Sequence, residues 1–119
     1  MSNNQELGKQ GEEVAVRYLL ENGYKIIERN FFCYSGEIDI IAKEKDEYVF
    51  IEVKTRTNRK YGEPIEAVHS IKQKHIWKAT EYYVYKNKLE NDFIRLDIIE
   101  VYKKNEKFYI RHVKKAMTG

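Results

Sequence analysis

Apolar positions recur along the chain with two spacings, and these spacings predict the order of helices and strands. From Leu7 to Leu19 they recur every three or four residues, which is typical of one face of a helix. We expect this helix to begin at a capping Asn3 or Asn4. It should end before Gly23, because glycine readily adopts the left-handed conformation that closes helices.

Beyond this helix, β-branched and aromatic residues alternate with polar ones in short runs, which predicts strands. Ser70 begins the capping-box pattern S-x-x-Q, so a second helix is expected from there to about Lys88. The basic residues 114–119 are expected to be a frayed tail after position 113. The pattern predicts an α/β fold of order αβββαββ, a mixed central sheet flanked by helices, with strands at residues 24–32, 38–42, 48–53, 93–102 and 108–113.

The two strands at residues 38–53 form a hairpin that carries opposed charges. If residues 44–47 are its loop, Asp39 lies opposite Glu52 and Glu37 lies opposite Lys54. Strand alternation then places all four side chains on one face. Opposed carboxylates repel unless a cation or a proton lies between them. The hairpin therefore indicates a divalent-cation site with an ammonium beside it, and a solvated sheet face is the alternative.

Glu12 of the first helix lies at the edge of the apolar arc, in line with Gly8 and Leu19. A carboxylate that points toward a core needs a partner, and Gly8, one turn earlier, leaves room for one to approach. Glu12 is therefore a candidate third acid above the hairpin. The alternative is a boundary residue whose carboxylate reaches water.

Composition bounds the class of protein. The 119 residues are enough for one domain with its own core, and 42% hydrophobic with 34% charged residues is typical of a globular protein. No stretch approaches the roughly 20 apolar residues of a membrane span, so no membrane partner is expected. The single cysteine, Cys33, excludes an intrachain disulfide and favours a reducing, cytoplasmic setting.

Charge is divided unevenly along the chain. Residues 1–53 have a net charge of −5, and residues 54–119 have a net charge of +8. This asymmetry suits a cation-binding centre flanked by a surface that binds a polyanion. Solvated surface residues are the alternative for each of the candidate phosphate contacts, which are Arg56, Arg59, Lys60, Lys72 and Lys74.

The order of elements and the placement of Asp39, Glu52 and Lys54 resemble the PD-(D/E)xK nuclease superfamily, although Ile38 stands where that motif has proline. The resemblance is closer to the YraN-like family of bacterial proteins and spans nearly the whole chain. The shared motifs are Gly11-Glu12, Gly23-Tyr24, Arg29-Asn30, Gly36-Glu37-Ile38-Asp39, Phe50-Ile51-Glu52-Val53-Lys54-Thr55-Arg56, Tyr61-Gly62 and Arg95-Leu96-Asp97.

The resemblance implies a restriction endonuclease-like or Holliday junction resolvase-like fold and an endonuclease that hydrolyses DNA, including branched DNA. It implies one or two Mg²⁺ or Mn²⁺ ions held by Asp39, Glu52 and the Val53 carbonyl. Glu12 would hold a metal-bound water or a second ion. Lys54 would orient the attacking water or stabilise charge in the transition state. Resolvase-like members often act as dimers, so a homodimer is compatible with the resemblance.

Two other functions remain open. One is a catalytically silent nucleic-acid-binding module of the same fold. The other is a protein-interaction domain that uses some of the ten tyrosines, several of which lie in Tyr82-Tyr83-Val84-Tyr85, although packing is the favoured role for these rings. No role is assigned to Glu37 or to Ser35.

Overall fold

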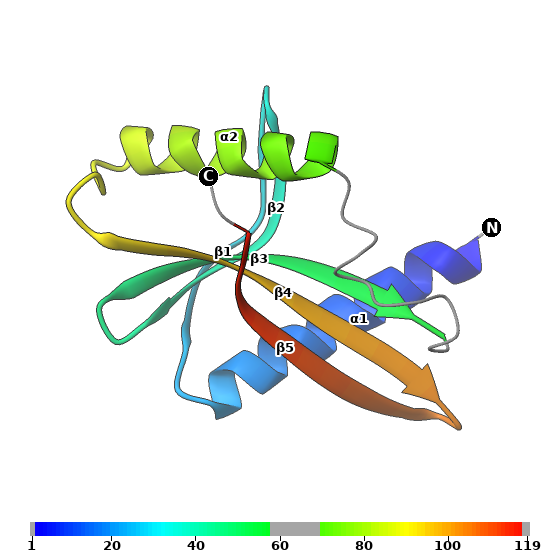
Figure 1. Cartoon of the computed structure of the whole chain (residues 1–119). Coiled ribbons are helices and arrows are strands. Elements are labelled where there is room, and N and C mark those ends of the chain that lie inside the picture. Colours follow the sequence, from blue (N-terminus) through cyan, green and yellow to red (C-terminus); the bar gives the residue numbers. More distant parts are fainter. Residues whose placement is uncertain (1, 58–69, 118–119) are drawn as a thin grey trace.

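The computed structural model describes the backbone of residues 2–57 and 70–117 and the side chains of residues 5–57 and 75–116. The chain folds in the predicted order αβββαββ (Figure 1). Its elements are α1 (Ser2–Glu21), β1 (Lys25–Cys33), β2 (Gly36–Glu44), β3 (Glu47–Arg56), α2 (Ser70–Lys86), β4 (Phe93–Lys104) and β5 (Lys107–Met117).

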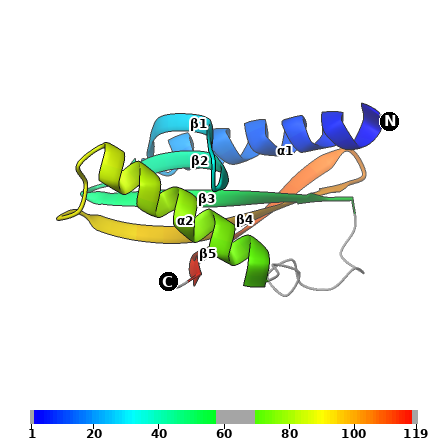
Figure 2. The ribbon, with the colours of Figure 1, turned by 90° about the horizontal axis from the view of Figure 1, so that it is seen from above.

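The five strands form one mixed sheet in the order β1-β2-β3-β4-β5. Among the strands that the structure describes, β3 and β4 alone pair in parallel, because α2 lies between them in the chain and returns it to the same end of the sheet. Figures 1 and 2 show α2 across one face of the sheet and α1 on the other. The predicted mixed α/β architecture is thus confirmed. Neither helix has the length and apolar character to cross a membrane within the part of the chain that the structure describes.

Each helix buries its apolar stripe against one face of the sheet, which gives the fold two cores. Under α2, Ile76, Ala79 and Tyr83 pack with strand residues that include Ile41 and Phe50. On the other face, Ala15 and Leu19 of α1 pack in one cluster with Tyr24, Ile40, Ala42, Val49, Ile51, Ile99 and Val101. The sheet is therefore buried on both faces, which explains why its central strands are so rich in isoleucine and valine.

Both ends of the chain differ from the prediction. Helix α1 begins at Ser2, so Asn3 and Asn4 lie within it and do not cap it. The prediction of a frayed tail is wrong for residues 114–117, because β5 continues to Met117. The backbone N–H of Lys115 donates to Asp97 Oδ1 at 3.0 Å, and this bond holds the end of β5 beside β4 across an irregular pairing.

The β2–β3 hairpin has the predicted register over part of its length. Lys43 pairs with Tyr48 and Glu44 with Glu47, which leaves a two-residue turn in place of the expected four-residue loop. The ladder then ends at Ile40 opposite Ile51. The expected pairs Asp39–Glu52 and Glu37–Lys54 lie beyond that point, so the prediction that they are paired in the ladder is wrong.

Alternation along β2 also fails next to Asp39. Ile38 and Ile41 pack under α2, whereas Ile40 and Ala42 pack under α1. Strict alternation would place Ile38 and Ile40 on the same face. The β1–β2 register places Asn30 of β1 opposite Asp39. Asn30 has a φ of 55°, a left-handed conformation that bends an extended strand. The sheet is therefore distorted at the position of the candidate catalytic acid.

Candidate active site

Asp39 lies where β2 and β3 separate. Its Oδ2 accepts a hydrogen bond of 2.8 Å from the backbone N–H of Val53. The β2–β3 ladder ends before Val53, so no backbone carbonyl of β2 accepts a hydrogen bond from the Val53 N–H. The Asp39 side chain accepts this bond instead. The carboxyl group is thereby fixed between the two strands and does not point freely into solvent.

Several acids act on the Asp39 carboxyl. Burial, together with the charges of Glu52, Glu12 and Glu37, raises the pKa of Asp39 to about 7, and the Val53 hydrogen bond opposes this only in part. A carboxyl group with that pKa is partly protonated at neutral pH. A cation bound beside it would favour the ionised form, as a cation does for any nearby carboxylate.

Glu52 and Lys54 lie on the other side of β3 from the α1 helix. Phe50 packs under α2, and the intervening Ile51 and Val53 pack under α1, so alternation directs Glu52 and Lys54 toward the α2 side. Glu52 is buried, with Lys54 Nζ 3.5 Å from its Oε2. The prediction that Glu37, Asp39, Glu52 and Lys54 share one face is wrong. Asp39 interacts with Glu52 at the place where β2 and β3 part.

Besides Glu52, another buried acid lies next to Lys54 and has no counterpart in the predicted site. Glu100 of β4 is directly beside Lys54 in the parallel register and is fully buried. Tyr102 donates a hydrogen bond of 2.8 Å to Glu100 Oε1, while Oε2 has no hydrogen-bond partner in the described part of the chain. Two acids, Glu52 and Glu100, therefore lie beside Lys54.

An open hollow of about 750 Å³ lies between the start of α1 and the distorted end of the sheet. Glu37 and Asp39 line it together with Val53 and Thr55 of β3 and residues of α1. Gly8 lines it as well, with no atom within 4 Å of where its Cβ would be, as expected for a glycine that leaves room for an approaching group. The hollow gives solvent, and therefore a ligand of this size, access to Asp39.

Glu12 lines the same hollow and is held at its edge by contacts of α1. A Cβ on the preceding Gly11 would collide with the side chain of Thr55, so glycine permits the close approach of α1 to β3. Arg29 of β1 lies 3.4 Å from Glu12 and 2.8 Å from the exposed Glu13. The partner that the position of Glu12 required is therefore Arg29, whose side chain is 35% exposed.

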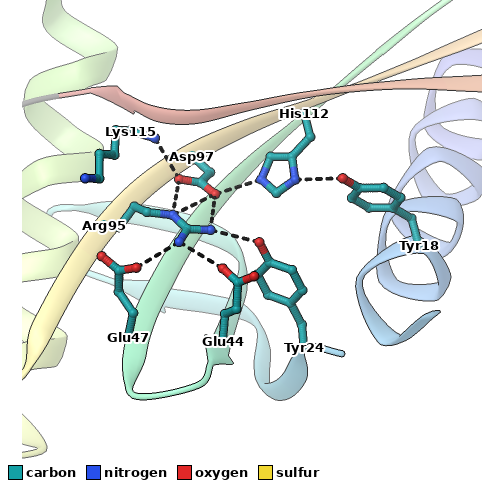
Figure 3. Close-up of polar contacts among 8 residues, drawn as sticks. All are labelled: Tyr18, Tyr24, Glu44, Glu47, Arg95, Asp97, His112 and Lys115. Atoms are coloured by element: carbon teal, nitrogen blue, oxygen red, sulfur yellow. Dashed lines mark hydrogen bonds and ion pairs between the residues drawn. The ribbon is translucent and has the colours of Figure 1, made fainter. Parts of the chain in front are cut away.

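A second polar cluster lies on the α1 side of the sheet, and the prediction missed it (Figure 3). Buried Arg95 of β4 forms ion pairs of 3.0 Å with Glu44 and 2.9 Å with Glu47 at the β2–β3 turn. It also donates to Asp97 and to the hydroxyl of Tyr24. Hydrogen bonds to these acids raise the pKa of Arg95 despite its burial, so the guanidinium stays charged.

Asp97 extends this cluster to β5 and α1. His112 Nε2 lies 2.7 Å from Asp97 Oδ2, and the Tyr18 hydroxyl lies 2.9 Å from His112 Nδ1. Bonds from His112, Arg95 and the Lys115 N–H outweigh burial and lower the pKa of Asp97. The sequence carried one sign of this cluster, the motif Arg95-Leu96-Asp97, in which two opposite charges flank a core leucine and so share a strand face.

Comparison with known proteins decides the family. Residues 11–101 match the model described as "Uncharacterised protein family UPF0102". The chain belongs to this family. The UPF0102 protein of Caldicellulosiruptor saccharolyticus is 48% identical over 116 residues, which cover 96% of this chain and 98% of the relative. That of Clostridioides difficile strain 630 is 54% identical over 100 residues, which cover 84% and 88%.

A third relative, the UPF0102 protein of Clostridium tetani, is 44% identical over 117 residues, which cover 97% of this chain and 96% of the relative. The UPF0102 family is the YraN-like family whose motifs the sequence carries, so that prediction is confirmed. The matched segment contains Glu12, Asp39, Glu52, Lys54 and the Arg95–Asp97 pair. The acidic centre lies within it, and so do Arg95 and Asp97 of the buried cluster, whereas His112 and Lys115 lie beyond its end.

The donor set around Asp39 fits a cation that takes few protein ligands. Among the described residues, no three His, Cys, Asp or Glu side chains converge closely enough to hold a metal ion. Mg²⁺, however, commonly uses one or two carboxylates and keeps several waters. Asp39 and Glu52 supply two interacting carboxyl groups, and the charges of the neighbouring acids, which together with burial raise the pKa of Asp39, would favour a cation beside it.

The predicted nucleic-acid contacts are only partly within the described structure. Arg56 is the last residue of β3, two positions after Lys54. Lys72 and Lys74 lie in the first turns of α2, although their side chains are outside the described residues. Arg59 and Lys60 lie outside the described residues altogether. Ser35, in the β1–β2 turn, lines a small hollow with Tyr34 and Tyr82, away from Asp39's hollow.

Proposed function

We propose that this protein is a metal-dependent endonuclease that hydrolyses phosphodiester bonds in DNA, including branched DNA. The observation that carries the proposal is the half-buried Asp39 at the edge of an open hollow, whose pKa is raised to about 7 by burial and by the neighbouring acids Glu52, Glu12 and Glu37. Neighbouring acids that strongly perturb one another's pKa are typical of functional sites. The resemblance to PD-(D/E)xK nucleases supplies the reaction class.

The chain's own residues divide the work. Asp39 and Glu52, with the Val53 carbonyl, would hold Mg²⁺ or Mn²⁺, which supplies Lewis-acid activation of the phosphate and a bound water of lowered pKa. Lys54 presents an ammonium, oriented by Glu52 at 3.5 Å, to the charge that develops on the phosphate. Glu12 borders the hollow and positions water there through its carboxylate. Arg56, two residues after Lys54 on β3, contacts a flanking phosphate.

The direct test is hydrolysis of labelled branched, duplex and single-stranded DNA with Mg²⁺, Mn²⁺ or EDTA. Wild type should cleave only with metal. Asp39→Asn and Lys54→Met should each lose at least about a hundredfold in rate, the scale of one lost electrostatic group. The matched control is Glu106→Gln in the β4–β5 turn, which should retain full rate. Equal cleavage by wild type and Asp39→Asn would refute the assignment.

A catalytically silent nucleic-acid-binding module is the second candidate, and specific contacts favour it. Glu52 is paired with Lys54, and Glu12 with Arg29, so part of the acidic charge is neutralised within the chain. Isothermal titration of Mn²⁺ separates the two functions. Binding that disappears in Asp39→Asn supports the nuclease. Salt-sensitive DNA binding without Mn²⁺ binding or cleavage supports the module.

A further inference from the structure

Four aromatic rings on one side of the molecule are exposed to solvent. They come from two elements, the end of the β1–β2 hairpin and the second half of α2. Tyr34 is fully exposed, and Tyr85 is 74% exposed. The favoured packing role is confirmed for Tyr83, which is buried, but it is wrong for Tyr85. We call this set the aromatic surface, and its members are Phe32, Tyr34, Tyr82 and Tyr85.

The aromatic surface is hollowed. Phe32, Tyr34 and Tyr82 border a hollow of about 220 Å³ that also includes Ser35 and Lys86. A second hollow of about 460 Å³ is lined by Tyr82, Tyr85, Lys86, Lys88 and Glu90. The two share Tyr82 and Lys86, so they adjoin and form one surface on which several flat groups could lie in succession.

The hairpin end that carries Tyr34 packs against α2. Phe31 stacks on Tyr82 with ring centroids 6.3 Å apart and meets Tyr83 edge to face at 5.1 Å. Farther along the hairpin, a Cβ on Gly36 would lie 3.2 Å from the carbonyl oxygen of His75. These contacts fix the hairpin end to α2 on both sides of Tyr34. A ligand that binds there would not have to order it first.

Charge indicates the kind of ligand. Lys86 Nζ lies 5.9 Å from the centroid of the Tyr82 ring, and Lys88 lines the same hollow, against one acid, Glu90. Aromatic faces interleaved with ammonium groups are the combination that binds single-stranded nucleic acid, because bases stack on the rings while phosphates pair with the cations. An apolar protein partner would not need the lysines.

We propose that the aromatic surface binds unpaired nucleotides of DNA, with bases stacked on its two most exposed tyrosine rings, Tyr34 and Tyr85, and phosphates beside Lys86 and Lys88. The strand must be unpaired, because the faces of bases within a duplex are covered by their neighbours. The inference rests on the proposed nuclease function and names a part of its substrate. Gly36, at the end of the hairpin that carries Tyr34, and Asp39 are three residues apart on β2, about 10 Å at roughly 3.3 Å per residue, so both sites lie on one short segment of the chain.

The test measures binding without cleavage. Anisotropy of labelled oligothymidylate and of a blunt duplex is recorded with full-length Asp39→Asn in EDTA. Adding Tyr34→Ala or Tyr85→Ala should weaken oligothymidylate binding by roughly tenfold each and leave duplex binding unchanged, since one stacked ring contributes about that much. Both rings are exposed, so thermal unfolding should stay near that of the parent.

Matched controls come from β5 and from the end of β4. Tyr109→Ala removes a ring that is 53% exposed but lies outside the aromatic surface. Lys103→Ala is the control for Lys86→Ala. It removes an ammonium that lies 5.7 Å from the centroid of the Phe108 ring, outside the aromatic surface. Oligothymidylate affinity should be unchanged in both controls and reduced in Lys86→Ala.

The inference is overturned if neither ring variant weakens oligothymidylate binding, if both weaken duplex binding equally, or if oligothymidylate does not bind. A change of oligomeric state in Tyr85→Ala with unchanged DNA binding would also overturn it and would mark a protein interface. Metal-dependent cleavage of duplex and branched DNA by wild type is measured separately. If wild type cleaves DNA but oligothymidylate does not bind, the nucleotide-binding role of the aromatic surface is refuted and the nuclease function stands. If oligothymidylate binds but no DNA is cleaved, the nuclease function is refuted and the nucleotide-binding role stands.

Discussion

Gly11 and Thr55 are in such close contact that a methyl group on Gly11 would overlap the Thr55 side chain. This contact sets the distance between α1 and β3, and therefore the position of Glu12 at the edge of the hollow. The shared motif Gly11-Glu12 thus combines a spacing requirement with a candidate catalytic acid. Thr55, two residues after Val53, is the matching surface on the strand.

Gly11→Ala should destabilise the protein by about 1–3 kcal/mol in urea unfolding, because overpacking outweighs the better helix propensity of alanine. Thr55→Ala should recover part of the loss in the double variant, since it removes two of the three overlapping atoms. Gly8→Ala is the matched control, because open space surrounds that position. It should be neutral or stabilising by up to about 1 kcal/mol. Equal effects of the two glycine substitutions would contradict the close contact.

Asp39 should make the metal-free protein less stable as pH rises. Its pKa is about 7 in the folded chain and near 3.8 when unfolded, so between these values the unfolded chain releases a proton that the native state keeps. Stability attributable to this group is therefore complete below about pH 4 and lost by about pH 7, on the order of a few kcal/mol. Urea unfolding in EDTA at pH 5 and pH 8 measures the difference.

Asp39→Asn keeps an oxygen that can accept the Val53 hydrogen bond but cannot ionise. It should abolish the decline between pH 4 and 7 and be more stable than wild type at pH 8. Asp46→Asn, in the exposed β2–β3 turn, is the control and should retain the wild-type profile. A wild-type profile that is flat or rises over this range would show that Asp39 is not buried among the other acids.

Periodicity was sufficient to predict the element order, a mixed sheet flanked by helices, and the hairpin register next to its turn. It could not predict the break at Asp39, which depends on the left-handed Asn30 on the neighbouring strand and on the Val53 N–H bond. Alternation extrapolated past that break wrongly placed Glu37, Asp39, Glu52 and Lys54 on one face. Pairing beyond a hairpin's last ladder bond is a tertiary property that a local pattern does not encode.

The Arg95 cluster was missed for a related reason. Its partners come from the β2–β3 turn, the segment after α1, and β5, so no sequence spacing unites Glu44, Tyr24 and His112. Only the Arg95–Asp97 spacing is local. The cluster also explains why β5 extends past position 113, because Asp97 binds the Lys115 N–H.

Arg95→Met should destabilise the protein by about 3–5 kcal/mol, because it leaves the buried Asp97 and the turn acids Glu44 and Glu47 without their cation. Arg29→Met is the matched control. It removes a guanidinium that also bridges two glutamates but is 35% exposed, so it should cost less than about 1 kcal/mol. Urea unfolding at pH 7 compares the two. Similar losses would show that the Arg95 cluster is not buried in solution.

Asp97→Ala should release the end of β5. The Lys115 N–H then loses its acceptor, and Lys115 already has a φ of 53° that a lysine adopts only when other contacts hold it. Amide hydrogen exchange should show Lys115 protected in wild type and exchanging at least about tenfold faster in the variant. The amide of Val101, in the middle of the β4–β5 ladder, is the internal reference and should change only as global stability changes. Unprotected Lys115 in the wild type would mean that β5 ends earlier, as periodicity alone predicts. The Asp97–Lys115 bond would then not form in solution.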